Sequence, residues 1–116
     1  MVAADYLFAG VVVREIDAAT EWYTRFFGRD PSFRPNDYES VWQAVPTGSV
    51  YVKADPPHAG HSAVTFAVAS IESELAGLAE RGIAAGPVEK VGNVGLEAKL
   101  NDPDGNEITL VEIRAG

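Results

Sequence analysis

The stretch NDPDGNEITLVE, residues 101–112, holds two aspartates, a proline and a glycine in one turn and runs straight into a strand-like segment. Pro103 fixes a turn φ, Asp102 and Asp104 can accept hydrogen bonds from nearby backbone amides, and Gly105 tolerates positive φ. A calcium-binding loop is the alternative, but for a loop that starts at Asp102 the glycine is in the wrong position and the twelfth residue, Ile113, is not a glutamate. The residues therefore predict a structural turn that opens a final strand.

Two helical segments, EIDAATEWYTRFFG at residues 15–28 and SIESELAGLAERG at residues 70–82, share one pattern. In each, apolar residues recur at spacings of three and four, as they do on the buried face of an amphipathic helix. Asp17 is the expected N-cap of the first helix and Ser70 that of the second, and a glycine ends both. This similarity predicts that one structural unit is used twice.

Short strand candidates surround both helices. One precedes each helix and three follow it: YLFAGVVVRE (6–15), SFRPNDYE (32–39), SVWQAVP (40–46), SVYVKA (49–54), then SAVTFAVAS (62–70), PVEKV (87–91), LEAKLN (96–101) and NEITLVEI (106–113). The prolines of ADPPHAGH stop any helix or central strand between the halves. We therefore expect a single domain, residues 1–116, with one βαβββ module at about 5–54, a linker at about 55–60 and a second module at about 61–114.

The composition restricts the class of protein. The chain has 116 residues, of which 47% are hydrophobic and 22% charged, and it has no cysteine, which excludes disulfides, zinc–thiolate sites and cysteine nucleophiles. Its net charge of −8 repels nucleic-acid phosphates and attracts cationic small molecules. The longest apolar run, YLFAGVVV, is too short to span a bilayer and no basic residue precedes it. We expect a cytoplasmic protein with neither a membrane nor a nucleic-acid partner.

The duplicated βαβββ pattern resembles the vicinal-oxygen-chelate superfamily, which includes glyoxalase, extradiol dioxygenases, fosfomycin-resistance enzymes and bleomycin-resistance proteins. DPDGNEITL matches the family's Asp-Pro-Asp-Gly-Asn motif, and Trp22-Tyr23 and Phe27-Gly28 lie where the family's first helix has Phe-Tyr and Leu-Gly. The resemblance covers essentially the whole chain. It implies an α+β fold in which two βαβββ modules form a curved mixed sheet with a concave cleft and helices on the outer face.

In the family's metal enzymes, His or Glu side chains from the first and last strands of each half converge on the concave face. Matching this chain to that pattern puts Phe8 and Ala63 on the two first strands and Thr109 on the final strand, and the remaining position falls near Tyr51 or Lys53. Phe and Ala cannot coordinate a metal, and a neutral Thr hydroxyl is a poor lone ligand. The resemblance is therefore closest to the metal-free bleomycin-resistance branch, with no metal, no cofactor and no catalytic residue expected.

An enzyme with shifted ligands, a metal-dependent lyase, isomerase or dioxygenase, is the alternative. Period-two alternation points His61 to the face of Ala63 and Glu107 to the face of Thr109, and these are the one ligand-like pair near the expected cleft. His58 and His61 are otherwise solvated linker residues. No G-x-S-x-G elbow and no phosphate-binding glycine loop offers other chemistry. A third hypothesis is an accessory subunit whose cleft is vestigial.

The expected cleft lining follows in part from the alternation of strand residues, which points Phe8, Val12, His61, Ala63, Thr65, Glu107 and Thr109 to the concave face, with Gly10 and Val111 beside them. Trp42 and Tyr51 join this lining from the other strands of the first half, with packing in the core or in a dimer interface as the alternative, and Phe33 and Tyr38 lie at the rim. Small residues at 10, 63 and 65 open space, and aromatic rings offer flat surfaces to a planar ligand. The bleomycin-resistance branch consists of small acidic homodimers that sequester a cationic or aromatic antibiotic. We therefore expect a homodimer that binds an aromatic or cationic small molecule.

Overall fold

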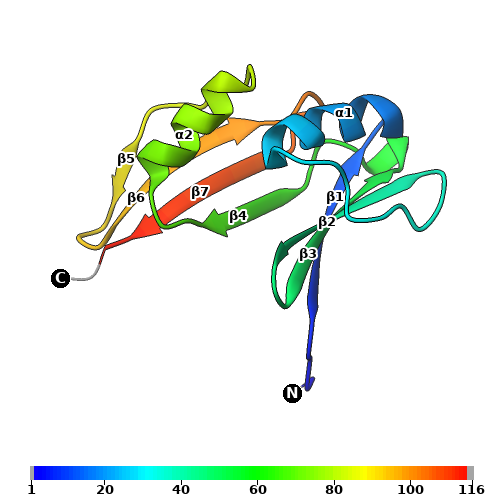
Figure 1. Ribbon diagram of the computed structural model, residues 1–116, viewed down its shortest axis with the longest axis horizontal. Helices are drawn as coiled ribbons and strands as arrows, with labels where there is room; N and C mark the ends of the chain where they lie inside the picture. The colour runs from blue at the N-terminus through cyan, green and yellow to red at the C-terminus, as the bar shows by residue number, and fades with distance from the viewer. Residues whose placement is uncertain (1, 115–116) are drawn as a thin grey trace.

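The computed structural model describes residues 2–114, which form two helices and seven strands in two sheets (Figure 1). The first half contains β1 (Leu7–Val13), α1 (Ile16–Phe27), β2 (Glu39–Val45) and β3 (Gly48–Ala54). A short turn, η1 (Pro56–His58), leads to β4 (Ala63–Ala67), α2 (Ile71–Glu80), β5 (Glu89–Val91), β6 (Gly95–Asn101) and β7 (Glu107–Ile113) in the second half. Figure 1 shows both helices on the upper side of the molecule. The α+β fold class expected from the sequence is confirmed.

Each sheet combines a parallel pair with antiparallel neighbours. The strand order is β1-β3-β2 in the first half and β4-β7-β6-β5 in the second, and the parallel pairs are β1 with β3 and β4 with β7. The halves differ at residues 32–39, where the sequence predicts a strand. That segment forms a single bridge, between Phe33 and Val41, because Pro35 and the turn after it interrupt the extended backbone.

The N-cap of helix α1 lies two residues before the expected one. Glu15, rather than Asp17, is the N-cap, because its carboxylate accepts hydrogen bonds from the amides of Asp17 and Ala18 at 3.3 and 3.2 Å. Gly28 ends the helix at φ 73°, a conformation that is strained for residues with a side chain. The buried face of α1 consists of Ala19, Trp22, Tyr23 and Phe26.

Helix α2 begins at the predicted cap. The Ser70 hydroxyl accepts a hydrogen bond from the amide of Ser73 at 3.2 Å. Ile71 and Leu78 are the buried residues of this helix. Within residues 2–114, neither α1 nor α2 has the length and apolarity that crossing a membrane requires.

One hydrophobic core joins the two halves. The ring of Phe66 on β4 lies with its centroid 5.6 Å from that of Phe26 and 5.9 Å from that of Phe27, both on α1. Leu78 of α2 and Leu110 of β7 belong to the same buried cluster. Because an aromatic pair contributes about 0.5–1.5 kcal/mol beyond its buried area, contacts between the halves help to stabilise both.

The turn at residues 102–106 is structural, as predicted, and it is buried against α1. One oxygen of Asp102 accepts hydrogen bonds from the amides of Asp104 and Asn106 at 3.0 and 2.9 Å. The other accepts a 2.7 Å bond from the hydroxyl of Tyr23. Burial, and then the neighbouring Asp102 carboxylate, raises the pKa of Tyr23, so the hydroxyl stays protonated and donates the hydrogen bond to Asp102.

Asn106 connects this turn to the first half of the chain. Its Nδ2 donates to the Val12 carbonyl and to Asp102, each at 2.8 Å, and its Oδ1 accepts from the Ser62 amide at 2.8 Å. The Ser62 hydroxyl accepts in turn from the Val12 amide at 3.0 Å. Asn106 is only 1% exposed, and an unpaired buried polar group costs about 1–3 kcal/mol. The motif therefore clamps β1 to the start of β4.

Candidate functional site

Directly paired residues of neighbouring strands lie on the same face of a sheet. The pairing therefore shows which side chains lie on the side of each sheet that the helices leave uncovered. We call this side the open face. Its paired rows are Phe8–Ser49–Gln43, Gly10–Tyr51–Val41 and Val12–Lys53–Glu39 in the first sheet, and Ala63–Glu107–Asn101, Thr65–Thr109–Lys99 and Ala67–Val111–Glu97 in the second. The open face carries every residue of the predicted lining except Trp42 and His61.

The first sheet presents aromatic rings on the open face. Tyr51 lies across Gly10, since a Cβ at residue 10 would be 2.5 Å from the Tyr51 hydroxyl oxygen. The prediction that Gly10 opens space is therefore wrong, because the Tyr51 ring occupies that space. The rings of Tyr6 and Phe8 have centroids 4.8 Å apart, and the hydroxyls of Tyr6 and Ser49 share a 2.5 Å hydrogen bond. Tyr6 and Ser49 are not among the predicted lining residues, although alternation from Phe8 and Tyr51 points to both.

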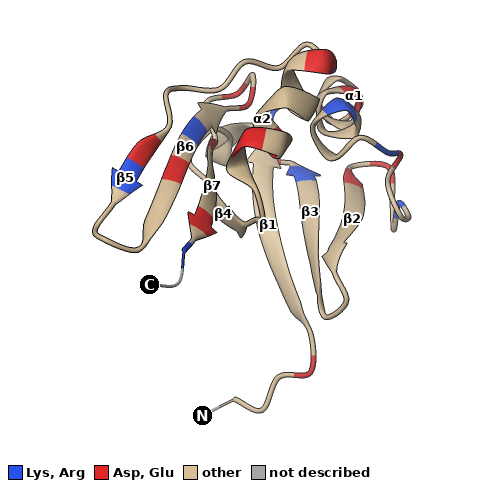
Figure 2. Cartoon of the chain, turned by 60° about the vertical axis from the view of Figure 1, so that its left-hand side comes forward, with Lys and Arg blue, Asp and Glu red and all other residues tan. Residues whose placement is uncertain are grey.

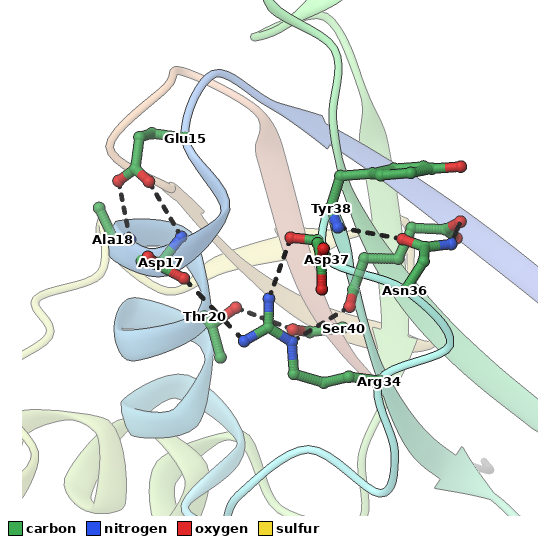
Figure 3. A network of polar contacts seen from close by, with 10 residues as sticks. Glu15, Asp17, Ala18, Thr20, Arg34, Asn36, Asp37, Tyr38 and Ser40 are labelled. Atoms are coloured by element: carbon green, nitrogen blue, oxygen red, sulfur yellow. Dashed lines mark hydrogen bonds and ion pairs between the residues drawn. The ribbon is translucent and has the colours of Figure 1, made fainter.

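A polar network fixes the loop between α1 and β2 (Figure 3). Arg34 donates to the carbonyls of Asp37 and Glu39 at 3.4 and 3.3 Å. Its guanidinium also lies 4.0 Å from the carboxylate of Asp17 in the first turn of α1. An arginine that contacts two carbonyls and one carboxylate holds the loop in one position against the helix and the sheet edge.

This loop carries the two aromatic residues predicted for the rim. Phe33 forms its bridge with Val41, whose amide donates to the Phe33 carbonyl at 3.0 Å. Phe33 thereby extends the row of Tyr51. Tyr38 lies at the end of the loop, and its amide donates to the side chain of Asn36 at 3.0 Å. Both rings are half exposed, at 52% for Phe33 and 50% for Tyr38.

The second sheet presents smaller and more polar side chains on the open face. Ala63 and Thr65 of β4 are exposed, and they pair with Glu107, which is exposed, and Thr109, which is buried. Lys99 of β6 lies opposite Thr109 and is a further polar residue that the sequence analysis missed. One half of the chain thus offers flat rings, while the other offers space, hydroxyls and charges of both signs.

The residues that the resemblance puts at the family's metal positions do not fit a metal ion. Phe8 and Ala63 have no donor atom, and Thr109 has only a neutral hydroxyl. Tyr51 and Lys53, on the strand that pairs with β1, supply neither a carboxylate nor an imidazole. Among residues 2–114, no three His, Cys, Asp or Glu side chains gather as a metal site. No metal-dependent step follows from this donor set.

His61 and Glu107, the alternative pair of metal ligands, do not interact directly in the described part of the chain. His61 precedes β4 rather than lying within it, and no hydrogen bond or ion pair between His61 and Glu107 occurs within the described chain. His58 belongs to η1, and its Nδ1 lies 2.9 Å from the carboxylate of Asp55. Both histidines are exposed.

Trp42 lies in the core and not on the open face, which corrects the predicted lining. It is fully buried, and its indole Nε1 donates to the Arg29 carbonyl at 3.0 Å. Its ring stacks on that of Phe27, with centroids 5.3 Å apart. Trp42 pairs with Val50, which faces the helices, so Trp42 takes the alternative position in the core.

Comparison with known proteins shows the family to which this chain belongs. A sequence model of the Glyoxalase/Bleomycin resistance protein/Dioxygenase superfamily matches residues 5–110. A glyoxalase/bleomycin resistance protein from Catenulispora acidiphila DSM 44928 is 37% identical over 95% of this chain and 99% of that one, with a TM-score of 0.88. The chain belongs to the glyoxalase/bleomycin-resistance/dioxygenase superfamily. No curated protein matches this member of the superfamily.

More distant solved structures share the fold of this superfamily. TnmS3, an antibiotic-binding protein from Streptomyces sp. CB03234, is 22% identical with a TM-score of 0.78, over 97% of this chain and 98% of that one. A bleomycin-binding protein in complex with bleomycin is 19% identical with a TM-score of 0.74, over 96% and 98% of the two chains. At these identities the likeness shows the fold alone.

Among the described residues of this member of the glyoxalase superfamily, Tyr23 and Glu112 have clearly shifted pKa values, and both lie on the helix side. Tyr23 is described above. Glu112 of β7 accepts hydrogen bonds from Arg114 at 2.5 Å and from the amide of Ile71 at 2.8 Å. The Arg114 contact, followed by the Ile71 amide, lowers the pKa of Glu112. Both shifts arise from contacts that support the fold.

Proposed function

We propose that this chain is a metal-free small-molecule-binding protein that sequesters an antibiotic or a toxic metabolite. The observation that carries the proposal is the aromatic part of the open face, where Tyr51 lies across Gly10 and Phe8 packs beside Tyr6. Such rings stack on planar ligands, and each pair contributes about 0.5–1.5 kcal/mol beyond burial. At the positions that hold a metal in related enzymes, this chain carries side chains that are suited to contact with an organic ligand rather than to metal coordination.

The ligand class that we propose is aromatic or cationic. The chain has 17 acidic and 9 basic residues, which gives a net charge of −8, and Figure 2 shows acidic residues in both halves. A surface of this sign raises the local concentration of cations. Glu107 is an exposed carboxylate on the open face that can pair with an ammonium group. Antibiotic-binding and bleomycin-binding proteins with the same fold support this class.

A second copy of the chain completes the proposed site. Phe8 is 53% exposed and Ala63 is also exposed, so the open face of one chain is a surface that binding partners can reach from solvent. Leu7 and Val45 are 70% and 55% exposed at the end of the first sheet, and β1 carries no charge along its length (Figure 2). Exposed apolar surface of this kind marks interfaces. The working form in the proposal is a cytoplasmic homodimer.

The first experiment is elemental analysis of protein purified without chelator or affinity metal. We expect near-zero metal and no thermal shift on adding Zn²⁺, Mn²⁺, Fe²⁺ or Ni²⁺. About one metal per chain, together with turnover of a diol, hemithioacetal or epoxide, would instead establish the enzyme alternative. In that case, loss of the metal in a His61→Ala variant would identify the shifted ligand.

The second experiment tests where the ligand binds. Calorimetric titration with bleomycin and other planar cationic antibiotics is compared between wild type, Ala63→Trp and Ala79→Trp. Ala63 lies on the open face, whereas Ala79 is exposed on α2, so the same added ring blocks only the first position. We expect Ala63→Trp to weaken binding about tenfold or more and Ala79→Trp to leave it unchanged. Equal effects at both positions, or no binding by any variant, would reject the open face as the site.

A further inference from the structure

A hollow on the helix side, opposite the open face, is not used by the proposed function. It lies between α1, α2 and the facing ends of β2 and β4, and its volume is about 340 Å³. Phe26, Phe27 and Phe66 line its floor, with ring centroids 5.0–5.9 Å apart. A volume above about 300 Å³ with an aromatic lining is in the range of small-molecule sites.

Two arginines stand at this hollow without a carboxylate partner. Arg29 donates to the Gln43 carbonyl, and Arg81 donates to the carbonyls of Arg25 and Phe26 at the end of α1. Within residues 2–114, neither guanidinium has an Asp or Glu oxygen within 4.0 Å. In a chain of net charge −8, two unneutralised guanidinium groups beside one hollow are an unusual concentration of positive charge.

Two glycines make room for the guanidinium of Arg81, which is half-buried between the helices. A Cβ at Gly77 would lie 3.2 Å from its Nη1, and one at Gly28 would lie 3.4 Å from its Cζ. The two glycines therefore leave the space that the planar group occupies between the helices. Glu74 also lines the hollow, but it forms no ion pair with either arginine. Its negative charge disfavours ligands with more than one negative charge.

A second hollow of about 340 Å³ adjoins the first and shares Ala44, Phe66 and Val68 with it. Its remaining wall includes Ala9 of β1 and Val50 of β3, both of which face the helix side. This hollow also reaches the edge between the sheets, where it is lined by Leu7 and Val45 of the proposed dimer interface and by Ser49, Thr65 and Ala67 of the open face. The combined groove therefore has a positively charged end, an aromatic floor and an apolar extension. We call it the helix-side groove.

We propose that the helix-side groove binds an amphipathic organic monoanion, an aromatic carboxylate with an apolar tail. Arginine is suited to carboxylates because its fork of N–H donors matches the two oxygens, and such charge-assisted bonds are stronger than neutral ones. The rings of Phe26, Phe27 and Phe66 accommodate the aromatic part, and the extension beside Ala9 and Val50 accommodates the tail. This ligand is an anion, whereas the ligand proposed for the open face is aromatic or cationic.

The test uses 4-butylbenzoate as the probe and 4-butylbenzamide, which has the same shape without the charge, as its control. Calorimetry with the full-length protein should show binding of the benzoate about tenfold tighter than of the benzamide. Benzoate without the tail should bind more weakly than 4-butylbenzoate. Affinity for 4-butylbenzoate should fall as salt rises, because ion pairs at an accessible groove are screened.

Charge-matched variants locate the site. Arg29→Gln should weaken 4-butylbenzoate binding about tenfold, and Arg29→Lys, which keeps the charge, should retain most of it. Arg25→Gln removes the same charge from an exposed α1 position that does not line the groove, so it should bind as wild type does. Thermal melting of each variant shows whether it is folded, and Phe66→Leu gives a second variant at the floor that leaves all arginines in place.

Four results would overturn the proposal. These are equal affinity for benzoate and benzamide, equal losses in Arg25→Gln and Arg29→Gln, and loss of 4-butylbenzoate binding in Ala63→Trp, which would place the anion on the open face. The fourth is a wild-type protein that does not bind 4-butylbenzoate and sediments as a dimer, together with a Phe66→Leu variant that sediments as a monomer. That result would make the groove a contact between copies.

Discussion

The ring of Tyr51 lies across Gly10, and the two residues are direct partners in the β1–β3 ladder. A methyl group at position 10 would meet the ring at 2.5–2.9 Å, closer than atoms can approach. The position of the most central aromatic ring on the open face is therefore set by the absence of a side chain on the neighbouring strand.

Replacing Gly10 by Ala should displace the Tyr51 ring. We expect a loss of about 1–3 kcal/mol in the free energy of unfolding, as for other overpacked sites, together with weaker binding of any aromatic ligand at the open face. Urea unfolding and calorimetry measure the two effects. In the double variant Gly10→Ala/Tyr51→Ala the clash is gone, so the Gly10→Ala step should then cost much less. Equal costs in both backgrounds would contradict the proposed cause.

Replacing Asn106 by Ala should destabilise the whole chain. The substitution leaves the Val12 carbonyl and the Ser62 amide without their partner, and we expect a cost of about 3 kcal/mol in the free energy of unfolding. Asn93→Ala, at an exposed position in the β5–β6 turn, is the matched control and should cost less than about 0.5 kcal/mol. Similar denaturation midpoints for the two variants would show that the clamp does not stabilise the fold.

Acid should weaken the fold partly through Glu112. Its pKa lies below the ordinary value of 4.5 in the folded state, so the folded chain binds fewer protons than the unfolded one near that pH. The stabilisation is full above pH 4.5 and is lost as the pH falls through the folded-state pKa. Melting temperatures across this range should fall less steeply for Glu112→Gln than for wild type. Glu21→Gln, on the exposed side of α1, should keep the wild-type profile.

Placing a charge at the uncharged end of the first sheet should separate the proposed dimer. Leu7 is 70% exposed in one chain, and an Asp there would be buried without a partner in the interface. Sedimentation velocity should show Leu7→Asp as a monomer with an unchanged circular dichroism spectrum. Val94→Asp, at a 52% exposed position in the second half, should remain dimeric. A monomeric wild type at micromolar concentration would rule out the dimer itself.

Much of the fold could be predicted because its signals are local. The spacing of apolar residues in 15–28 and 70–82 and the turn chemistry of residues 102–106 depend on neighbours along the chain, and the structure contains both helices and the turn. The N-cap of α1 was harder to predict, because Glu15 and Asp17 are both hydrogen-bond acceptors within one turn of the chain.

The site could be predicted less well because it depends on register. The side of the sheet on which Trp42 lies is set by its pairing with Val50, a contact between strands that the sequence of β2 alone does not contain. To predict that the Tyr51 ring fills the space beside Gly10, one must know that β1 and β3 are parallel partners. Residues 32–39 have the composition of a strand, but a proline in their middle decides the outcome.

The clamp at Asn106 has a consequence for how the chain can be divided. The Tyr23 hydroxyl and the Val12 carbonyl in the first half form hydrogen bonds with Asp102 and Asn106 in the second half. The ring of Phe66 packs beside α1. A peptide ending in the linker would expose that surface and leave those groups to water. Cleavage near residue 58 should therefore yield two fragments that are each poorly ordered but reassemble when mixed, so the chain is suited to use as a split reporter whose signal depends on reunion of its halves.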